Sequence, residues 1–152
     1  MTSLLYQASI FAMHIRLIIA GKPALTYAKT GLEEYLKRLS RSSNYELIVV
    51  KAGNRDEVSD RLLERSQGCY RIAMDERGES LSTRKFAEKF EVLERRGEIR
   101  TVAFLIGAAD GHNENLREKC DLILALSTFT LQHELALLVL LEQLYRLESL
   151  KI

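Results

Sequence analysis

The sequence predicts an α/β fold in which a mostly parallel, five- to six-stranded sheet carries helices on both faces. Strand-like and helix-like segments alternate five times along the chain. The strand-like segments are almost continuously apolar, which is typical of strands buried on both faces. The chain has 152 residues, of which 47% are hydrophobic and 28% charged, so it suits one globular domain with a substantial core.

The first two strand–helix units occupy residues 14–68. The apolar run HIRLIIA predicts the first strand, and apolar residues that recur every three or four positions after it predict an amphipathic helix. The run YELIVVKA predicts the second strand, and Asn54 with Glu57 has the spacing of a capping box for the next helix. The expected bounds are strand 14–20, helix 25–39, strand 45–52 and helix 54–68.

The remaining three units occupy residues 69–150. The run CYRIAM predicts the third strand, and the DERG sequence at 75–78 predicts a turn. Ser82 and Gly97 are expected to cap and to end the next helix. The runs VAFLI and LILAL predict the last two strands. The expected bounds are strand 69–74, helix 82–97, strand 100–106, helix 113–120, strand 122–126 and helix 132–150.

We expect residues 13–152 to form a single domain and residues 1–12 to be an N-terminal extension. Those first residues lack the basic leader and cleavage site of a signal peptide. No apolar run approaches the ~20 residues needed to cross a membrane. The two cysteines, Cys69 and Cys120, lie beside or within apolar runs and are expected to be buried and reduced. These features predict a cytoplasmic protein.

The net charge of +1, from 22 basic and 21 acidic residues, does not by itself indicate a nucleic-acid partner. Any basic surface must therefore be local or be assembled from two chains. Basic residues also cluster where helices are expected to end, and there they complement the helix dipole. We interpret two clusters in this way: Lys37, Arg38 and Arg41, and Arg95, Arg96 and Arg100.

Several catalytic signatures are absent from the sequence. No GxGxxG motif or acidic pair follows the first strand, and the chain has no Walker loop and no GxSxG elbow. The three histidines have no metal-ligand spacing with the cysteines, so we expect no metal site. What remains are three segments at the carboxyl ends of strands, where parallel sheets bind ligands. They are residues 74–78, 107–111 and 126–133.

Two of these segments have the composition of a ligand site. Gly107 would allow a ligand to approach the backbone closely. Residues 126–131 alternate apolar side chains with hydroxyl groups, which suits a ligand that has a flat apolar part and polar edges, such as an adenosine. Ordinary loop chemistry explains the same residues, and this pattern alone does not separate the two interpretations.

Three linked segments resemble the SPOUT methyltransferases of the RlmH type. They are LIGAADG at 105–111, LSTFTLQHELA at 126–136 and LLEQLYR at 140–146. The first strand with Gly21 and Lys22, the EEYLKRL sequence and the MDERGESLST sequence agree with the same family, so the resemblance runs from Met13 to about Arg146. It implies methylation of N3 of a pseudouridine in bacterial 23S ribosomal RNA.

The resemblance also implies a deep C-terminal trefoil knot, S-adenosylmethionine as the cofactor, a homodimer, and the assembled ribosome as the partner. No metal is implied. Carried over residue by residue, the cofactor contacts are Met74, Gly107, Leu126, Ser127, Thr128, Phe129, Thr130 and Leu131.

His133 and Arg146 are the candidate catalytic residues. His133 could contact RNA or order the cofactor loop, or it could only cap the last helix. Arg146 could hold a phosphate or the substrate base. It is also four residues from Glu142, which is the spacing of an ordinary ion pair on a helix surface.

The chain departs from the family pattern at several places. Ala108 replaces a second glycine, Gln132 replaces a common proline, and Leu137 stands where some members have arginine. Members also continue beyond the last helix into a short tail containing glycine, glutamate, tyrosine and histidine, which is not found before Ile152. That tail is thought to help form the substrate site. The alternative hypothesis is therefore a catalytically impaired homologue that binds cofactor or ribosome without efficient methyl transfer.

Overall fold

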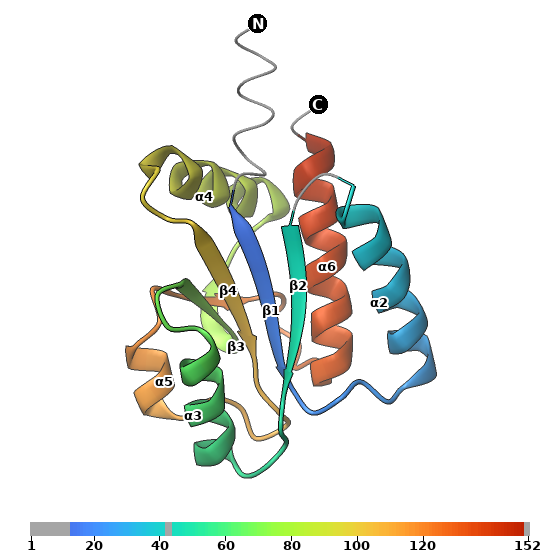
Figure 1. The fold of residues 1–152 in the computed structure, drawn as a ribbon, viewed down its shortest axis with the longest axis vertical. Coiled ribbons are helices and arrows are strands. Elements are labelled where there is room, and N and C mark those ends of the chain that lie inside the picture. Colours follow the sequence, from blue (N-terminus) through green and yellow to red (C-terminus); the bar gives the residue numbers. More distant parts are fainter. Residues whose placement is uncertain (1–12, 42–43, 151–152) are drawn as a thin grey trace, which may run out of the picture.

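The computed structural model describes residues 13–41 and 44–150; the predicted N-terminal extension lies outside these ranges. Five parallel strands form one sheet in the order β2-β1-β4-β3-β5 (Figure 1). The strands are β1 (His14–Ala20), β2 (Asn44–Val50), β3 (Tyr70–Ser80), β4 (Thr101–Ile106) and β5 (Leu122–Ala125). The helices are α2 (Thr26–Leu39), α3 (Arg55–Arg65), α4 (Thr83–Arg96), α5 (Glu114–Glu118) and α6 (His133–Leu150).

The central strand β4 is buried on both faces. Phe104 faces one core, where it stacks on Phe90 of α4 with ring centroids 6.1 Å apart. Its neighbours Ala103 and Leu105 face the other core. Because both faces of this strand exclude water, apolar residues are favoured at every position, which accounts for the continuous apolar run.

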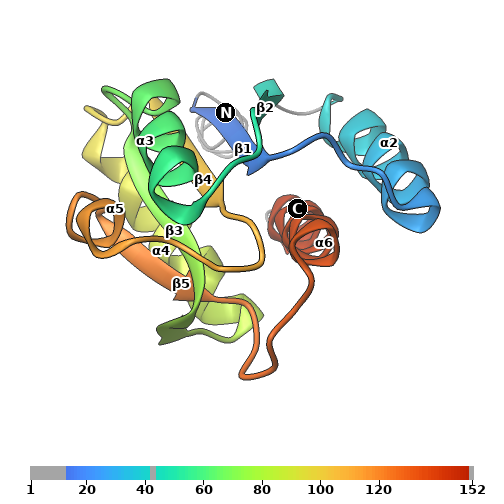
Figure 2. The ribbon, with the colours of Figure 1, turned by 90° about the horizontal axis from the view of Figure 1, so that it is seen from below.

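Helices cover both faces of the sheet (Figure 2). Helices α2, α4 and α6 share one core with the first face, and α2 packs along α6. Helix α3 packs on β1, β2 and α5 at the opposite face. The α/β class, the parallel sheet and the two helical layers are thus confirmed. No helix in the described part of the chain is long and apolar enough to span a membrane.

The helix ends follow local sequence signals. The Asn54 side chain accepts a hydrogen bond from the Glu57 amide (2.8 Å), and the Glu57 carboxylate accepts one from the Asn54 amide (3.1 Å), so the capping box is present. Ser82 caps α4, and Gly97 ends it with a φ of 73°. The predicted end at Gly68 is wrong, because α3 stops at Arg65.

The turn predicted at residues 75–78 is also wrong. Strand β3 continues to Ser80, and both Met74 and Glu79 are in register with Leu124 of β5, so the residues between them form an irregularity within the strand. The β5 backbone passes against this segment: a Cβ atom on Gly78 would lie 2.5 Å from the Ile123 carbonyl oxygen. The pairing with a distant strand therefore extends β3 beyond its apolar part.

The two cysteines lie at the edge of the core under α3 and α5. Cys69 and Cys120 are both free and half-buried, so the expectation that they are reduced is consistent with the structure, whereas full burial was wrong. Burial raises the pKa of the Cys120 thiol to about 11, which makes it a poor nucleophile.

Candidate active site

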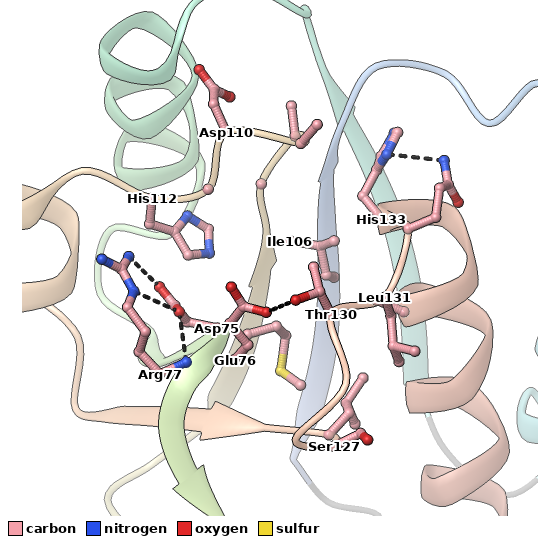
Figure 3. Close-up of a pocket in the computed structure, with 18 of the residues that line it drawn as sticks. Asp75, Glu76, Arg77, Ile106, Asp110, His112, Ser127, Thr130, Leu131 and His133 are labelled. Carbon is pink, nitrogen blue, oxygen red and sulfur yellow. Dashed lines mark hydrogen bonds and ion pairs between the residues drawn. The ribbon is translucent and has the colours of Figure 1, made fainter.

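A cavity of about 610 Å³ opens at the carboxyl edge of the sheet, beside the irregularity in β3 and the segments that follow β4 and β5. Figure 2 views the molecule from this edge, and Figure 3 shows the cavity. Its apolar wall includes Met74, just before the irregularity in β3, Ile106 at the end of β4, and Leu126 directly after β5. Parallel sheets bind ligands at this edge. The site therefore lies where the sheet topology leads one to expect it.

The cavity brings most of the sequence-predicted site residues together. Those that line it are Met74, Gly107, Leu126, Ser127, Phe129, Thr130, Leu131 and His133. Thr128 and Arg146 do not line it. Phe129 is 78% exposed, at the tip of the loop between β5 and α6. Six further residues with ionisable side chains line the cavity, and none was named as a site residue from the sequence, although residues 75–77 and 110 lie in the segments expected to bind a ligand: Arg55, Asp75, Glu76, Arg77, Asp110 and His112.

Gly107 and His112 pack directly against each other. A Cβ atom on Gly107 would lie 3.1 Å from both Cε1 and Nδ1 of the His112 ring. Because this contact is tighter than side chains normally accept, glycine is the residue type that fits here without movement of the ring. The bare backbone of Gly107 therefore forms part of the cavity wall.

His112 is buried, with 2% of its surface exposed. Its Nε2 atom lies 3.1 Å from the carbonyl oxygen of Leu105, to which the protonated nitrogen donates. Burial lowers the pKa of His112, although the Leu105 carbonyl and Asp75 oppose that shift. The neutral ring therefore supports the turn after β4 from behind. Nδ1 has no hydrogen-bond partner among the described residues.

Asp75 and Arg77 form an ion pair beside His112 (Figure 3). The guanidinium Nε and Nη2 atoms donate to the two Asp75 oxygens at 3.0 and 2.8 Å, and the Arg77 amide donates at 2.9 Å. Burial favours the protonated acid, but the bonds and charge of Arg77 outweigh it, so the pKa of Asp75 is lowered. An ionised carboxylate held in this way is a poor proton acceptor, and it neutralises Arg77.

A second polar contact joins two sides of the cavity. The Thr130 hydroxyl donates to the Glu76 carboxylate, which connects the loop between β5 and α6 to β3 (Figure 3). Within the same loop, the Phe129 amide donates to the Ser127 hydroxyl at 3.0 Å. These bonds hold the predicted cofactor loop in a defined conformation.

The start of α6 is fixed by the side chains of Gln132 and Glu134, neither of which was a candidate site residue in the sequence. Gln132 accepts hydrogen bonds from the amides of Glu134 (2.9 Å) and Leu135 (3.1 Å), so it supplies the cap that His133 had been considered to provide. The buried Glu134 carboxylate accepts from the amides of Ala24 (2.8 Å) and Leu25 (3.0 Å). Gln132 therefore compensates locally for the proline that it replaces.

Arg146 lies far from the cavity of its own chain. It follows His133 by 13 residues on one helix, which corresponds to ~20 Å along the axis. Its Nε atom is 2.5 Å from a Glu142 oxygen, and 61% of its side chain is exposed. In a single chain, Arg146 is therefore a surface ion-pair residue.

Comparison with known proteins identifies the family. A family model described as "Predicted SPOUT methyltransferase" matches residues 13–151. This chain belongs to the SPOUT methyltransferase family. One similar curated protein is "Ribosomal RNA large subunit methyltransferase H" of Thermus thermophilus. It is 45% identical over 139 residues, which cover 91% of this chain and 94% of the relative. The protein of that name from Deinococcus radiodurans is 38% identical over 136 residues, covering 88% of this chain and 91% of the relative.

A solved structure has a similar fold. A probable methyltransferase from Bordetella pertussis superposes with a TM-score of 0.57, covering 92% of this chain and 98% of that chain at 12% sequence identity. At that identity the comparison speaks for the fold alone. In the described part of the chain, no group of three or more histidine, cysteine, aspartate or glutamate residues could hold a metal ion.

Proposed function

We propose that this SPOUT methyltransferase transfers a methyl group from S-adenosylmethionine to N3 of a pseudouridine in 23S ribosomal RNA, within the assembled ribosome in the cytoplasm. The observation that carries the proposal is the cavity between the irregularity in β3 and the segments that follow β4 and β5, in a chain of this family. The name of these relatives, ribosomal RNA large subunit methyltransferase H, supports the class of substrate.

The residues of the cavity fit the cofactor. A volume of about 610 Å³ suits a nucleoside-sized ligand. The bare Gly107 backbone and the apolar Met74, Leu126 and Leu131 would contact the flat base, and the Ser127 and Thr130 side chains would contact its polar edges. Thr128 and Phe129 belong to the same proposed set through the loop that they share. When bound, S-adenosylmethionine supplies an electrophilic methyl group.

The N3–H bond breaks as the bond to the methyl group forms, so the protein has to align the acceptor nitrogen with this methyl group and allow the N3 proton to leave. Asp75 is poorly suited to accept that proton because Arg77 holds its ionised form. His112 is buried behind Gly107. His133 lies on the cavity wall at the start of α6 and is partly exposed. We therefore assign to His133 the contact with the target base.

The proposed enzyme is a homodimer. Arg146 lies ~20 Å along α6 from His133, so in its own chain it does not reach the reacting base. A second copy packed against α6 would allow Arg146 to hold a phosphate or the base at the neighbouring site. We also propose that the segment after β4 threads into the deep trefoil knot implied by the family resemblance.

The decisive experiment incubates the protein with methyl-labelled S-adenosylmethionine and ribosomes that lack the modification. We expect label in 23S ribosomal RNA, at N3 of one pseudouridine located by nuclease mapping and mass spectrometry. Ribosomes that already carry the methyl group and a Gly107→Val variant are the controls, and both should remain unlabelled. Cofactor binding without transfer to RNA would instead support the impaired-homologue hypothesis and refute the proposal.

A further inference from the structure

We propose that Arg55, with Lys22 and Lys51, forms a phosphate-binding row that holds the RNA backbone beside the cavity. This inference rests on the proposed function, because it names how the RNA substrate is held. Arg55, Lys22 and Lys51 all lie outside the segments that are proposed to bind the cofactor.

The three cations lie at the carboxyl edge of the sheet. Lys22 follows β1 and Lys51 follows β2, which are neighbouring strands with Ala20 in register with Val50. The Gly21 amide donates to the Val50 carbonyl at 2.8 Å, so the two lysines leave the sheet from adjacent positions. Arg55 begins α3 only four residues after Lys51, and it lines the cavity.

The charges of these three side chains are not neutralised within the described residues. All three residues are exposed, and none of their side chains forms a hydrogen bond or an ion pair with another described residue. The other arginine in the cavity lining, Arg77, is bound to Asp75. Arg55 is therefore the cavity cation that remains available to an anionic ligand. The Asp110 carboxylate also lines the cavity, but it does not pair with Arg55.

The position of Arg55 does not favour the stability of its own helix. It occupies the first residue of α3, next to the Asn54 cap, where the helix dipole disfavours a positive charge. The acidic residues Asp56 and Glu57 follow it and suit this end of the helix. A cation at this site thus opposes the local electrostatic preference, which points to a role outside the helix.

The row fits a polyanion better than the single carboxylate of the cofactor. Only Arg55 lines the cavity, whereas Lys22 and Lys51 extend the positive charge along the edge of β1 and β2. Successive phosphates of an RNA strand can contact such a row while the target base enters the cavity. Phosphate contacts of this kind position a nucleic acid without reading its sequence.

The test compares Arg55→Gln and a triple variant, with Lys22→Gln and Lys51→Gln added, against Arg65→Gln. Arg65 lies on the same helix ten residues later, ~15 Å from Arg55 along the axis. We expect Arg55→Gln to weaken the binding of 23S ribosomal RNA or the large subunit on the order of tenfold. The slope of log affinity against log salt should fall by about one. The triple variant should show larger effects, and Arg65→Gln should match the wild type.

The affinity for S-adenosylmethionine should be unchanged in all three variants, as measured by calorimetry. Unchanged RNA affinity and salt slope in Arg55→Gln would overturn the inference. So would a selective loss of cofactor affinity, because Arg55 would then hold the cofactor carboxylate. RNA binding is measured without methyl transfer, so a wild-type protein that binds RNA through Arg55 but does not methylate it would refute the proposed function alone.

Discussion

Gly107 shows how one missing side chain shapes the candidate active site. The His112 ring fills the space that a side chain at position 107 would need. The sequence predicts that a ligand approaches the Gly107 backbone closely. In the structure, the His112 side chain of the same turn packs against Gly107 from the opposite side. The sequence does not indicate this supporting role of His112, because it depends on how the turn after β4 folds.

We expect Gly107→Ala to disturb the cavity without unfolding the protein. The new methyl group would lie 3.1 Å from the His112 ring, and the strain should lower the free energy of unfolding by about 1–3 kcal/mol. The displaced turn should also weaken S-adenosylmethionine binding, measured by calorimetry. Ala108→Gly changes the adjacent residue without adding bulk and is the control. Equal cofactor affinity in Gly107→Ala and the wild type would contradict this account.

His112 should make stability depend on pH. Its pKa in the folded protein lies below its usual value of 6.5, chiefly because the ring is buried. The unfolded chain therefore binds more protons than the folded protein below that pH, so stability should fall as the pH drops from 6.5 through the folded pKa. Because His112→Gln keeps an amide donor for the Leu105 carbonyl but cannot titrate, it should lose this dependence. Urea unfolding between pH 5 and 8 measures it, and an identical pH dependence in the variant would contradict it.

At the scale of secondary-structure elements, the start of α6 positions the cofactor loop. Gln132 caps the helix and Glu134 anchors it to the segment before α2. The loop 126–132 is therefore held at its end by a contact with residues more than 100 positions earlier. Local sequence signals do not report such a contact, because both partners are defined by the packing of α2 on α6.

We expect Glu134→Ala to destabilise the protein by about 1–3 kcal/mol, because it leaves the Ala24 and Leu25 amides without their acceptor. The freed loop should also bind S-adenosylmethionine more weakly. Glu134→Gln is the matched control, since it retains an acceptor oxygen and should preserve most of both properties. Chemical denaturation and calorimetry measure the two effects, and similar losses in both variants would argue against the anchoring role.

Strand β3 is longer than its local sequence predicts. Its apolar part ends at Met74, and the polar DERG sequence that follows has the composition of a turn. The backbone nevertheless continues to Ser80 because β5 pairs with it on both sides of the irregularity. Three of the residues between, Asp75, Glu76 and Arg77, are thereby placed at the cavity.

At the scale of the whole molecule, the separation of His133 and Arg146 requires a second chain if both act on one substrate. A mixture of Arg146→Ala and Gly107→Val chains tests this. If Arg146 serves the neighbouring site, each mixed dimer has one intact site. Random exchange should then restore about a quarter of the wild-type methyl-transfer activity.

The single variants, tested alone, should be inactive, and light scattering should show a dimer for both. If mixed dimers form but the sample stays inactive, Arg146 does not act across the interface. A monomeric wild-type protein would contradict the dimer itself. Subunit exchange is verified with differently tagged chains, so that a failure to mix is recognised.

The sequence by itself determined the α/β class, the alternation of strands and helices along the chain, several helix caps, and the segments that carry the candidate site. These depend on periodicity and on interactions between residues a few positions apart. The tertiary structure alone decided the strand order, the extension of β3, the support of Gly107 by His112, the neutralisation of Arg77 by Asp75 at the cavity, and the exclusion of Arg146 from it. Each of these depends on where separate segments meet in space, and burial and pairing between distant segments leave no local pattern in the chain.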